Sequence, residues 1–337
     1  TKIYVFMYLK DIIRGVKDMI KIDLITGFLG AGKTTFIKKY ASYLMKQGKK
    51  IGILENDFGA INVDMLLLQD LEGDNCTLEM IAGGCDADCH RRRFKTKLIA
   101  MAMEGYDRVI VEPSGIYDVD EFFDALHEEP LDQWYEVKNV IAIVDAKLEK
   151  RLSEEADFIL ASEAANAGKI VLSHADLATK EQIEGTIRHL QQAMENIQCS
   201  RKLTEDEIIA GNMETLTDAQ LQELSGCGYV SSSYRKMDLE NHLGFDSLYF
   251  MNAPVTKETL PDKVKQILQD PGCGKIFRVK GFLKDETGAW YQLNASKDAF
   301  DFQPIPTGQE VIIAIGENLK EGAIKKILFG DVDVKSY

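Results

Sequence analysis

Short runs of apolar residues alternate with stretches of helical pattern between Met19 and about residue 200. Continuous apolar runs separated by helices are typical of a parallel β-sheet that is covered by helices on both faces. The predicted strands are Lys21–Thr26, Lys50–Leu54, Arg108–Val111, Val140–Val144 and Lys169–Ser173, and the clearest helices are Thr34–Lys46 and Thr179–Ile197. The pattern predicts an α/β domain with a mostly parallel sheet over residues 19–200.

The remainder of the chain has a different order of elements. Residues 201–235 are polar and helix-prone and are predicted to form a connector, and residues 1–18 are taken as an N-terminal extension without an assigned role. Strands then predominate, which predicts a smaller α+β domain with a mostly antiparallel sheet over residues 236–337. Its predicted strands are Ser247–Phe250, Lys275–Leu283, Ala289–Leu293 and Glu310–Ile315, and its predicted helices are Leu260–Asp270 and Leu319–Leu328.

Composition and charge argue against several kinds of partner and against a disulfide framework. The formal net charge is -14, which disfavours nucleic acid and anionic membranes, because both are bound by basic surfaces. The sequence has no apolar run approaching the roughly 20 residues of a membrane helix. Six cysteines in 337 residues are too few and too irregularly spaced for a disulfide framework. We therefore expect a cytoplasmic protein with neither nucleic acid nor membrane as a partner.

A glycine-rich loop directly follows the first predicted strand and reads Gly27-Phe-Leu-Gly-Ala-Gly32-Lys33-Thr34-Thr35. It fits G-x-x-x-x-G-K-[ST] in the required order of strand, loop and helix. Its glycines let the backbone approach phosphate oxygens, Lys33 neutralises the β- and γ-phosphates, and the Thr34 hydroxyl ligates Mg²⁺. The residues predicted to hold a nucleoside triphosphate here are Gly27, Gly30, Ala31, Gly32, Lys33, Thr34 and Thr35.

Acidic residues stand at the ends of two other predicted strands. One strand ends in Glu55-Asn-Asp57 and another in Glu112-Pro-Ser-Gly115. The carboxyl ends of parallel strands meet at one edge of a sheet, which is where ligands of α/β domains bind. We expect Glu112 to act in the shell of the magnesium ion or on the attacking water, with Glu55 and Asp57 in reach of both, and the amide of Gly115 to approach the γ-phosphate.

Together these motifs resemble the CobW/HypB/UreG family of P-loop GTPases, and most closely its CobW-like branch. The matching segments are Gly27–Thr35, Glu55–Gly59, Gly83–Cys85, Glu112–Gly115 and, in the second domain, Phe277–Phe282. The resemblance extends over residues 19–330 and includes the order of the two domains. It implies hydrolysis of GTP coupled to the handling of a transition metal, often zinc or cobalt, for a client enzyme or a cofactor pathway.

The family's metal motif is altered in this chain. Relatives carry Cys-x-Cys-Cys, whereas this chain has Cys85-Asp-Ala-Asp-Cys89-His90. On a helical turn Cys85 and Cys89 share a face, and thiolates suit zinc or cobalt. Completing ligands could come from Asp86, Asp88, His90 or Cys76. The alternative is a pair of thiols that binds no metal.

The family's base-recognition motif is altered as well. Where relatives carry Asn-Lys-x-Asp, this chain has Ser173-His174-Ala-Asp176. Asp176 keeps the carboxylate that accepts hydrogen bonds from guanine, while His174 replaces the aliphatic stem that covers the base and Ser173 lacks an amide. The resemblance therefore implies a preference for GTP over ATP that is weaker than in the intact motif.

The function expected from the sequence is that of a GTP-hydrolysing metallochaperone that requires Mg²⁺ and delivers zinc or cobalt. Nucleotide state is expected to alter the loops after Glu55 and around Cys85–Cys89. Expected partners are a client metalloenzyme or a cofactor-pathway protein, and a homodimer is compatible with the family. The alternative is a nucleotide-dependent assembly or activator protein that acts on a client enzyme. This activator would have no metal site of its own.

Overall fold

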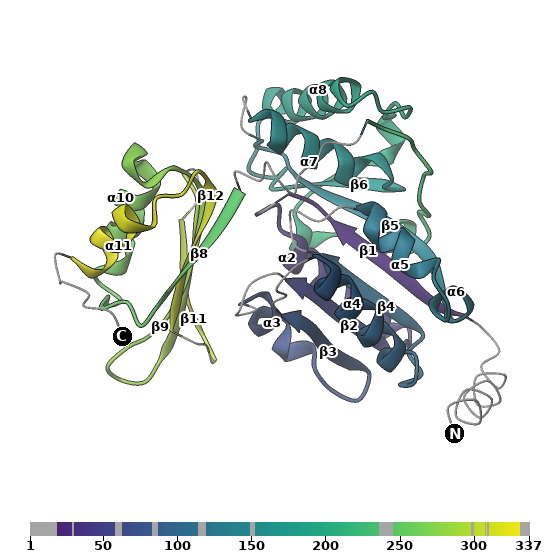
Figure 1. The fold of residues 1–337 in the computed structure, drawn as a ribbon, viewed down its shortest axis with the longest axis horizontal. Coiled ribbons are helices and arrows are strands. Elements are labelled where there is room, and N and C mark those ends of the chain that lie inside the picture. Colours follow the sequence, from purple (N-terminus) through teal and green to yellow (C-terminus); the bar gives the residue numbers. More distant parts are fainter. Residues whose placement is uncertain are drawn as a thin grey trace. The chain divides into compact units, whose positions relative to one another are not determined.

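The chain folds into two compact units, and Figure 1 shows the elements of each. The computed structural model describes residues 19–57 except Leu29, 63–82, 87–113, 119–148, 152–235 and 245–330 except 298, 299, 307 and 309. The first unit extends to Lys236 and the second begins at Met237. The proposed N-terminal extension, residues 1–18, lies outside the described residues.

The first unit contains a seven-stranded sheet in which every paired strand is parallel. Its strands are β1 (Ile20–Thr26), β2 (Ile51–Asp57), β3 (Cys76–Ala82), β4 (Arg108–Pro113), β5 (Tyr135–Asp145), β6 (Lys169–Ser173) and β7 (Ile208–Ala210). They lie in the order β3-β2-β4-β1-β5-β6-β7. The predicted parallel sheet is therefore confirmed, and β1, which carries the glycine-rich loop, is its central strand.

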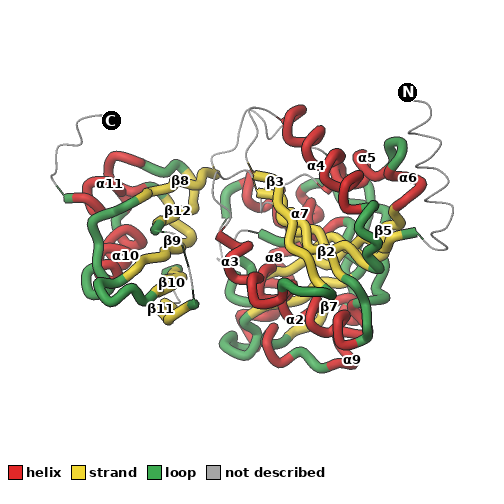
Figure 2. Tube along the Cα trace, turned by 90° about the horizontal axis from the view of Figure 1, so that it is seen from below, coloured by secondary structure: helices red, strands yellow, loops and turns green. Residues whose placement is uncertain are grey.

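Helices cover both faces of this sheet. They are α2 (Lys33–Lys46), α3 (Val63–Leu68), α4 (Ala87–Met101), α5 (Val119–Leu126), α6 (Leu131–Trp134), α7 (Glu154–Ala165), α8 (Lys180–Asn196) and α9 (Asp218–Leu224). Figure 2 shows α4, α5 and α6 on one side of the strands and α2 and α9 on the other. On the α2 side, Phe36 and Tyr40 pack with Ile25, Ile53 and Ile143 of the sheet in one buried core.

Two strands of this sheet, β3 and β7, were not predicted from the sequence. The edge strand β3 carries polar Thr77 and Glu79 between its apolar residues, so it is not a continuous apolar run. Strand β7 has three residues and pairs with β6. Residues 201–235, the expected connector, contain β7 and α9, and both of these elements belong to the first compact unit. Buried Arg201 ties this stretch to α7 by donating to the Ala164 carbonyl oxygen at 2.9 Å.

The second unit is a five-stranded antiparallel sheet with helices, as predicted. Its elements are β8 (Phe245–Met251), α10 (Leu260–Gln269), β9 (Lys275–Lys284), β10 (Trp290–Ala295), β11 (Phe300–Ile305), β12 (Val311–Glu317) and α11 (Glu321–Phe329). The sheet order is β11-β10-β9-β12-β8. The edge strand β11 was not predicted, because polar residues and Pro304 interrupt its apolar pattern.

Across the described parts of both units, no helix combines the length and the apolar character needed to cross a bilayer.

Candidate functional site

The glycine-rich loop brings the end of β1 to the start of α2 by backbone conformations that favour glycine. Gly27, Gly30 and Gly32 have φ values of 146°, 84° and 93°. A Cβ on Gly27 would lie 2.2 Å from the carbonyl oxygen of Ile143 in β5, so no larger residue fits there. Ala31 is buried within the loop, whereas Thr35 on the first turn of α2 is exposed.

Among the described residues, the start of α2 has no side-chain cap, in contrast to three other helices of the first unit. Gly32 is its N-cap residue, no side chain accepts a hydrogen bond there, and the first turn contains no acidic residue. By contrast, Ser153, Thr179 and Thr217 cap α7, α8 and α9 through their hydroxyl groups. The first amides of a helix attract anions when no side chain satisfies them. The start of α2 is therefore suited to a phosphate group.

Lys33 and Thr34 meet Glu112 of β4 beneath this loop. The Lys33 ammonium donates a hydrogen bond to the carbonyl oxygen of Gly27 at 2.8 Å and lies 4.0 Å from Glu112 Oε1. The Thr34 hydroxyl donates to the same carboxylate oxygen at 3.3 Å. Lys33 and Glu112 are both buried. The structure thus brings together the lysine, the hydroxyl and the strand-end carboxylate that the sequence assigned to one site.

Glu55 lies next to Glu112 across the sheet. Strands β2 and β4 are neighbours, and their register places Glu55 directly opposite Glu112. Both carboxylates are buried, with 3% and 5% of each residue exposed. Asp57 ends β2, but its side chain is outside the described residues, as is Gly115. Of the three acids expected at the strand ends, Glu55 and Glu112 therefore lie opposite each other on neighbouring strands.

Ser173 lies close to the phosphate loop at the end of β6. A Cβ built on Gly32 would be 3.8 Å from the Ser173 Cβ, and Ser173 is fully buried. The next residue, His174, has a positive φ of 53° and half-exposes its ring. Its Nδ1 lies 3.1 Å from the Asp145 carboxylate at the end of β5. Asp145 therefore orients the ring of His174, which the sequence analysis predicted to lie beside the base.

Asp176 is exposed and is oriented by a residue that the sequence did not indicate. Its Oδ2 accepts a hydrogen bond from Asn212 Nδ2 at 2.9 Å. Asn212 follows β7 and reaches Asp176 because Gly211 donates its amide to the Leu172 carbonyl oxygen at 3.3 Å. The contact joins residues 36 positions apart, so only the pairing of β6 with β7 reveals it.

The predicted metal residues are only partly described. Cys85 lies outside the described residues, and Cys89 is half-buried near the start of α4. Cys76 does not complete such a site, because it begins β3, six residues before the end that precedes Cys85. It is buried in the core, and burial raises the pKa of its thiol to about 11. Among the described residues, no group of three or more metal-ligating side chains gathers.

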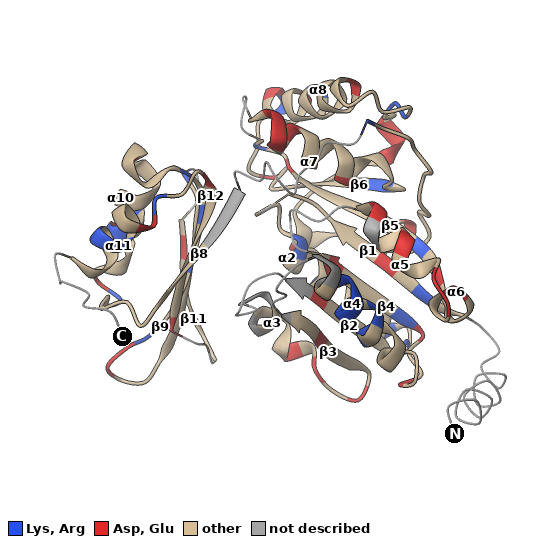
Figure 3. Ribbon diagram, viewed as in Figure 1, with Lys and Arg blue, Asp and Glu red and all other residues tan. Residues whose placement is uncertain are grey.

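Basic side chains are concentrated on α4, just after Cys89. Figure 3 shows them along this helix, and they are Arg91, Arg92, Arg93, Lys95 and Lys97. Arg91 and Lys95 both form ion pairs with Glu128, each at 2.6 Å, and Lys97 pairs with Glu79 at 2.7 Å. At least three of the five charges therefore join α4 to neighbouring elements.

A further acidic residue near the phosphate loop was missed. Glu163 on α7 has 1% of its surface exposed and lies near Lys33. Its signal in the sequence was weak: one glutamate within the apolar and small residues of Phe158–Ala165. Nine of the twelve helix residues are buried, so an acid at this position must also be buried.

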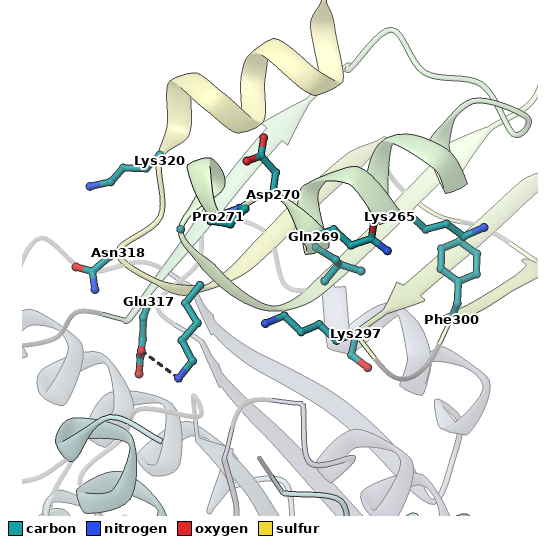
Figure 4. Close-up of a pocket in the computed structure, with 13 residues that line it drawn as sticks. Lys265, Gln269, Asp270, Pro271, Lys297, Phe300, Glu317, Asn318 and Lys320 are labelled. Atoms are coloured by element: carbon teal, nitrogen blue, oxygen red, sulfur yellow. Dashed lines mark ion pairs between the residues drawn. The ribbon is translucent and has the colours of Figure 1, made fainter. Parts of the chain in front are cut away.

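The second unit contains a separate cavity of about 1000 Å³ (Figure 4). Four lysines belong to its lining: Lys265, Lys275, Lys297 and Lys320. Lys275 forms an ion pair with Glu317 at 3.4 Å. The described residues that line this cavity all belong to the second unit.

The first unit has the architecture and the loop of a P-loop nucleotide-binding domain: a parallel sheet, a glycine-lysine loop after its central strand and an uncapped helix start. The chain belongs to the CobW/HypB/UreG family, since the profile of that family's nucleotide-binding domain matches residues 21–204, more than half of its length.

Three individual proteins to which the chain is similar share 20–30% of their residues with it in the matched regions. The zinc chaperone YeiR of Escherichia coli is 30% identical over 178 residues, and the match spans 52% of each chain, about half the length of that relative. The zinc-regulated GTPase metalloprotein activator 1 of Schizosaccharomyces pombe is 22% identical over 90% of this chain and 83% of its own. The crystal structure of the Zn(II)-bound GTPase YjiA of Escherichia coli gives a TM-score of 0.35 at 20% identity, covering 92% of this chain and 98% of that one.

Proposed function

We propose that this protein is a GTP-hydrolysing metallochaperone that couples its nucleotide state to the binding and delivery of zinc. The observation that carries the proposal is the uncapped start of α2 with Lys33 and Thr34 gathered against Glu112. Relatives named zinc chaperones and a zinc-regulated GTPase metalloprotein activator support zinc as the cargo. Nothing favours cobalt over zinc.

The triphosphate would bind at the amides of Gly30, Gly32 and the first turn of α2. Lys33 would leave the Gly27 carbonyl oxygen and neutralise the β- and γ-phosphates, because a bound anion offers it a stronger acceptor. The Thr34 hydroxyl and the Glu112 carboxylate are oxygen donors 3.3 Å apart, which is the ligand type that Mg²⁺ prefers. A magnesium ion held there supplies charge neutralisation to the departing phosphate.

Hydrolysis would depend on the paired acids at the sheet edge. Glu112 and Glu55 stand opposite each other on β4 and β2, where their carboxylates orient a water molecule by accepting its hydrogen bonds. We assign Asp57, at the end of β2, to the same task. Both described carboxylates are buried, so their effect on a nearby water is not weakened by bulk solvent.

The base would bind at Ser173, His174 and Asp176. Asp176 offers two acceptors to the N1 and N2 hydrogens of guanine, a pattern that adenine does not complement. The Asn212 amide occupies part of the acceptor capacity of Asp176 Oδ2 and holds the carboxylate in place. His174 presents its ring instead of a lysine stem, so GTP is preferred over ATP by less than in the intact motif.

Zinc would be carried as cargo by the thiolates of Cys85 and Cys89. Cys85 follows β3 in the sequence, Cys89 lies in the first turn of α4, and β3 neighbours β2 with its Glu55. Binding requires deprotonated thiols, so zinc uptake should release protons and weaken as pH falls. A client metalloprotein in the cytoplasm would receive the zinc. The chain would act as a homodimer.

One experiment tests the cargo and its coupling together. Zinc is titrated into the reduced chain with GTP, with GDP and without nucleotide, and the Cys85→Ser/Cys89→Ser variant is compared with the control variant Cys199→Ser. The proposal expects nucleotide-dependent zinc affinity that only the double variant loses, and GTP affinity that rises with zinc by the same factor.

The opposite result has a clear meaning. If the unmodified chain takes up no zinc in any nucleotide state, the metallochaperone proposal fails. A nucleotide-dependent activator without a metal site of its own then replaces it, as the displaced second thiol of the cysteine motif favours. Lys33→Ala separately tests the nucleotide site, since it should abolish phosphate release from GTP.

A further inference from the structure

Glu163 is a buried acid for which the described residues supply no hydrogen bond of normal geometry. It lies on α7, has 1% of its surface exposed, and neither of its carboxyl oxygens has a hydrogen-bond partner of normal geometry. The nearby Thr26 hydroxyl, at the end of β1, is buried and likewise has no hydrogen bond of normal geometry within the described part of the chain. An ionised carboxyl group is rarely buried unless it is paired, because desolvation of the charge is expensive. Its position therefore calls for an explanation.

The groups that face Glu163 among the described residues belong to the nucleotide site. They are the Thr26 hydroxyl from β1, the Gly27 amide from the phosphate loop and the Lys33 ammonium from α2. Lys33 is the charged member of this set, and it is already bonded to the Gly27 carbonyl oxygen at 2.8 Å. A charge on Glu163 would therefore act directly on the lysine that must meet the triphosphate.

We propose that Glu163 is a positioning residue for Lys33, and that triphosphate binding takes up a proton at Glu163. This inference rests on the proposed nucleotide site. An ionised Glu163 holds the Lys33 ammonium by charge attraction and repels the phosphates from below the loop. A protonated Glu163 does neither, and its hydroxyl can donate to the nearby Thr26 oxygen.

The electrostatics of the site agree with this assignment. Burial raises the pKa of Glu163 from 4.5 to about 8, although Lys33, Gly27 and Thr26 favour the ionised form. When Lys33 turns to a bound triphosphate, that favourable interaction weakens and negative charge is added nearby. Both changes disfavour the carboxylate further, so nucleotide binding and protonation of Glu163 support each other.

Calorimetric titration with the non-hydrolysable analogue guanosine 5′-(β,γ-imido)triphosphate and Mg²⁺ tests the proposal. Titrations in buffers of different ionisation enthalpy count the protons taken up on binding. With a pKa of about 8 in the nucleotide-free state, the unmodified chain should lose about fourfold in affinity between pH 7 and pH 8.5, relative to Glu163→Gln. Glu163→Gln cannot ionise and should show neither this loss of affinity with pH nor the proton uptake.

Matched controls separate this effect from others. Glu154→Gln removes an exposed acid from the same helix and should retain the proton uptake of the unmodified chain. Titration of the nucleotide itself occurs with every variant and cancels in the comparison. Equal proton uptake by Glu163→Gln and the unmodified chain, or no uptake by the latter at pH 8, overturns the role of Glu163. If the unmodified chain binds no nucleotide at pH 7, the proposed nucleotide site itself fails.

Discussion

Two buried carboxyl groups lie against the central strand β1, and their surroundings are opposite. Asp23 is fully buried and three residues before Thr26, the residue that faces Glu163. Asp23 accepts hydrogen bonds from Tyr40 at 2.8 Å, Asn139 at 2.8 Å and Arg108 at 2.8 and 2.9 Å. Among the described residues, Glu163 has no hydrogen bond of normal geometry. One carboxyl group is completely satisfied within the protein and the other is not.

The difference separates a structural role from a functional one. The partners of Asp23 come from α2, β4 and β5, so the network holds three elements to β1. Burial raises the pKa of Asp23, while the Arg108 guanidinium opposes the rise. Glu163 joins no such network among the described residues and faces Lys33, the lysine proposed to meet the triphosphate. A satisfied buried network makes a fold specific, and an unsatisfied group can respond to a ligand.

The largest effect is expected when the Asp23 network is broken. Asp23→Asn leaves Arg108, whose side chain is 13% exposed, without its counter-charge. Removing one partner of a buried ion pair costs about 3–5 kcal/mol, which urea unfolding would measure. Nucleotide affinity of the folded variant should remain within a factor of about two, because none of the hydrogen bonds described for Asp23 involves a residue of the loop.

An exposed ion pair on the same strand is the control for this prediction. Lys21 of β1 pairs with Glu136 of β5, with 34% and 49% of the side chains exposed. Glu136→Gln should cost less than about 1 kcal/mol, since solvent screens such pairs. Equal costs for the two variants would remove the structural half of the comparison.

The stability of the fold should fall with rising pH because of Glu163. Its folded pKa of about 8 lies above the ordinary value of 4.5, so the neutral carboxyl stabilises the folded state. That contribution is complete below the ordinary value and is lost as pH rises through the folded pKa. Relative to Glu163→Gln, the unmodified chain should lose up to about 1.4 kcal/mol per pH unit between pH 5 and pH 8. Parallel stability profiles for both chains would contradict a buried, protonated Glu163.

Glu112 should affect hydrolysis more than stability or binding. Glu112→Gln keeps the shape of the side chain but removes the charge beside Lys33 and the Thr34 hydroxyl. Phosphate release under single-turnover conditions should fall roughly 100-fold, because a positioned carboxylate no longer acts on the water or metal. Glu55→Gln should show a smaller decrease. Hydrolysis at the unmodified rate by Glu112→Gln would make the strand-end acid structural.

The smallest effects are expected at the base. Asp176→Ala should remove about 2 kcal/mol of the preference for GTP over ATP, since the guanine hydrogens lose both acceptors. Asn212→Ala frees Asp176 from its 2.9 Å hydrogen bond and should reduce the preference by about 1 kcal/mol. Competition titration of both nucleotides measures the two effects. A larger loss in Asn212→Ala than in Asp176→Ala would contradict the assigned order of roles.

Local sequence determined the phosphate loop and the first architecture. The loop from Gly27 to Thr34 is a contiguous motif, and its glycines, lysine and hydroxyl can therefore be recognised without a fold. The alternation of apolar runs and helices was sufficient for a parallel sheet, whose carboxyl edge then placed Glu112 and Glu55 near the loop. Boundaries of the predicted strands differ from the observed ones by a few residues, most at β5, which begins at Tyr135.

Only the tertiary structure decided the roles of residues that act across the sheet. The short strand β7 has too little pattern to be recognised, yet its pairing with β6 brings Asn212 to Asp176 and makes 201–235 part of the first unit. Cys76 and Glu163 could not be placed from their neighbours in sequence, because strand order and helix packing put one in the core and the other beneath the loop. Contacts between residues far apart in the chain depend on the order in which strands assemble, and local pattern does not encode that order.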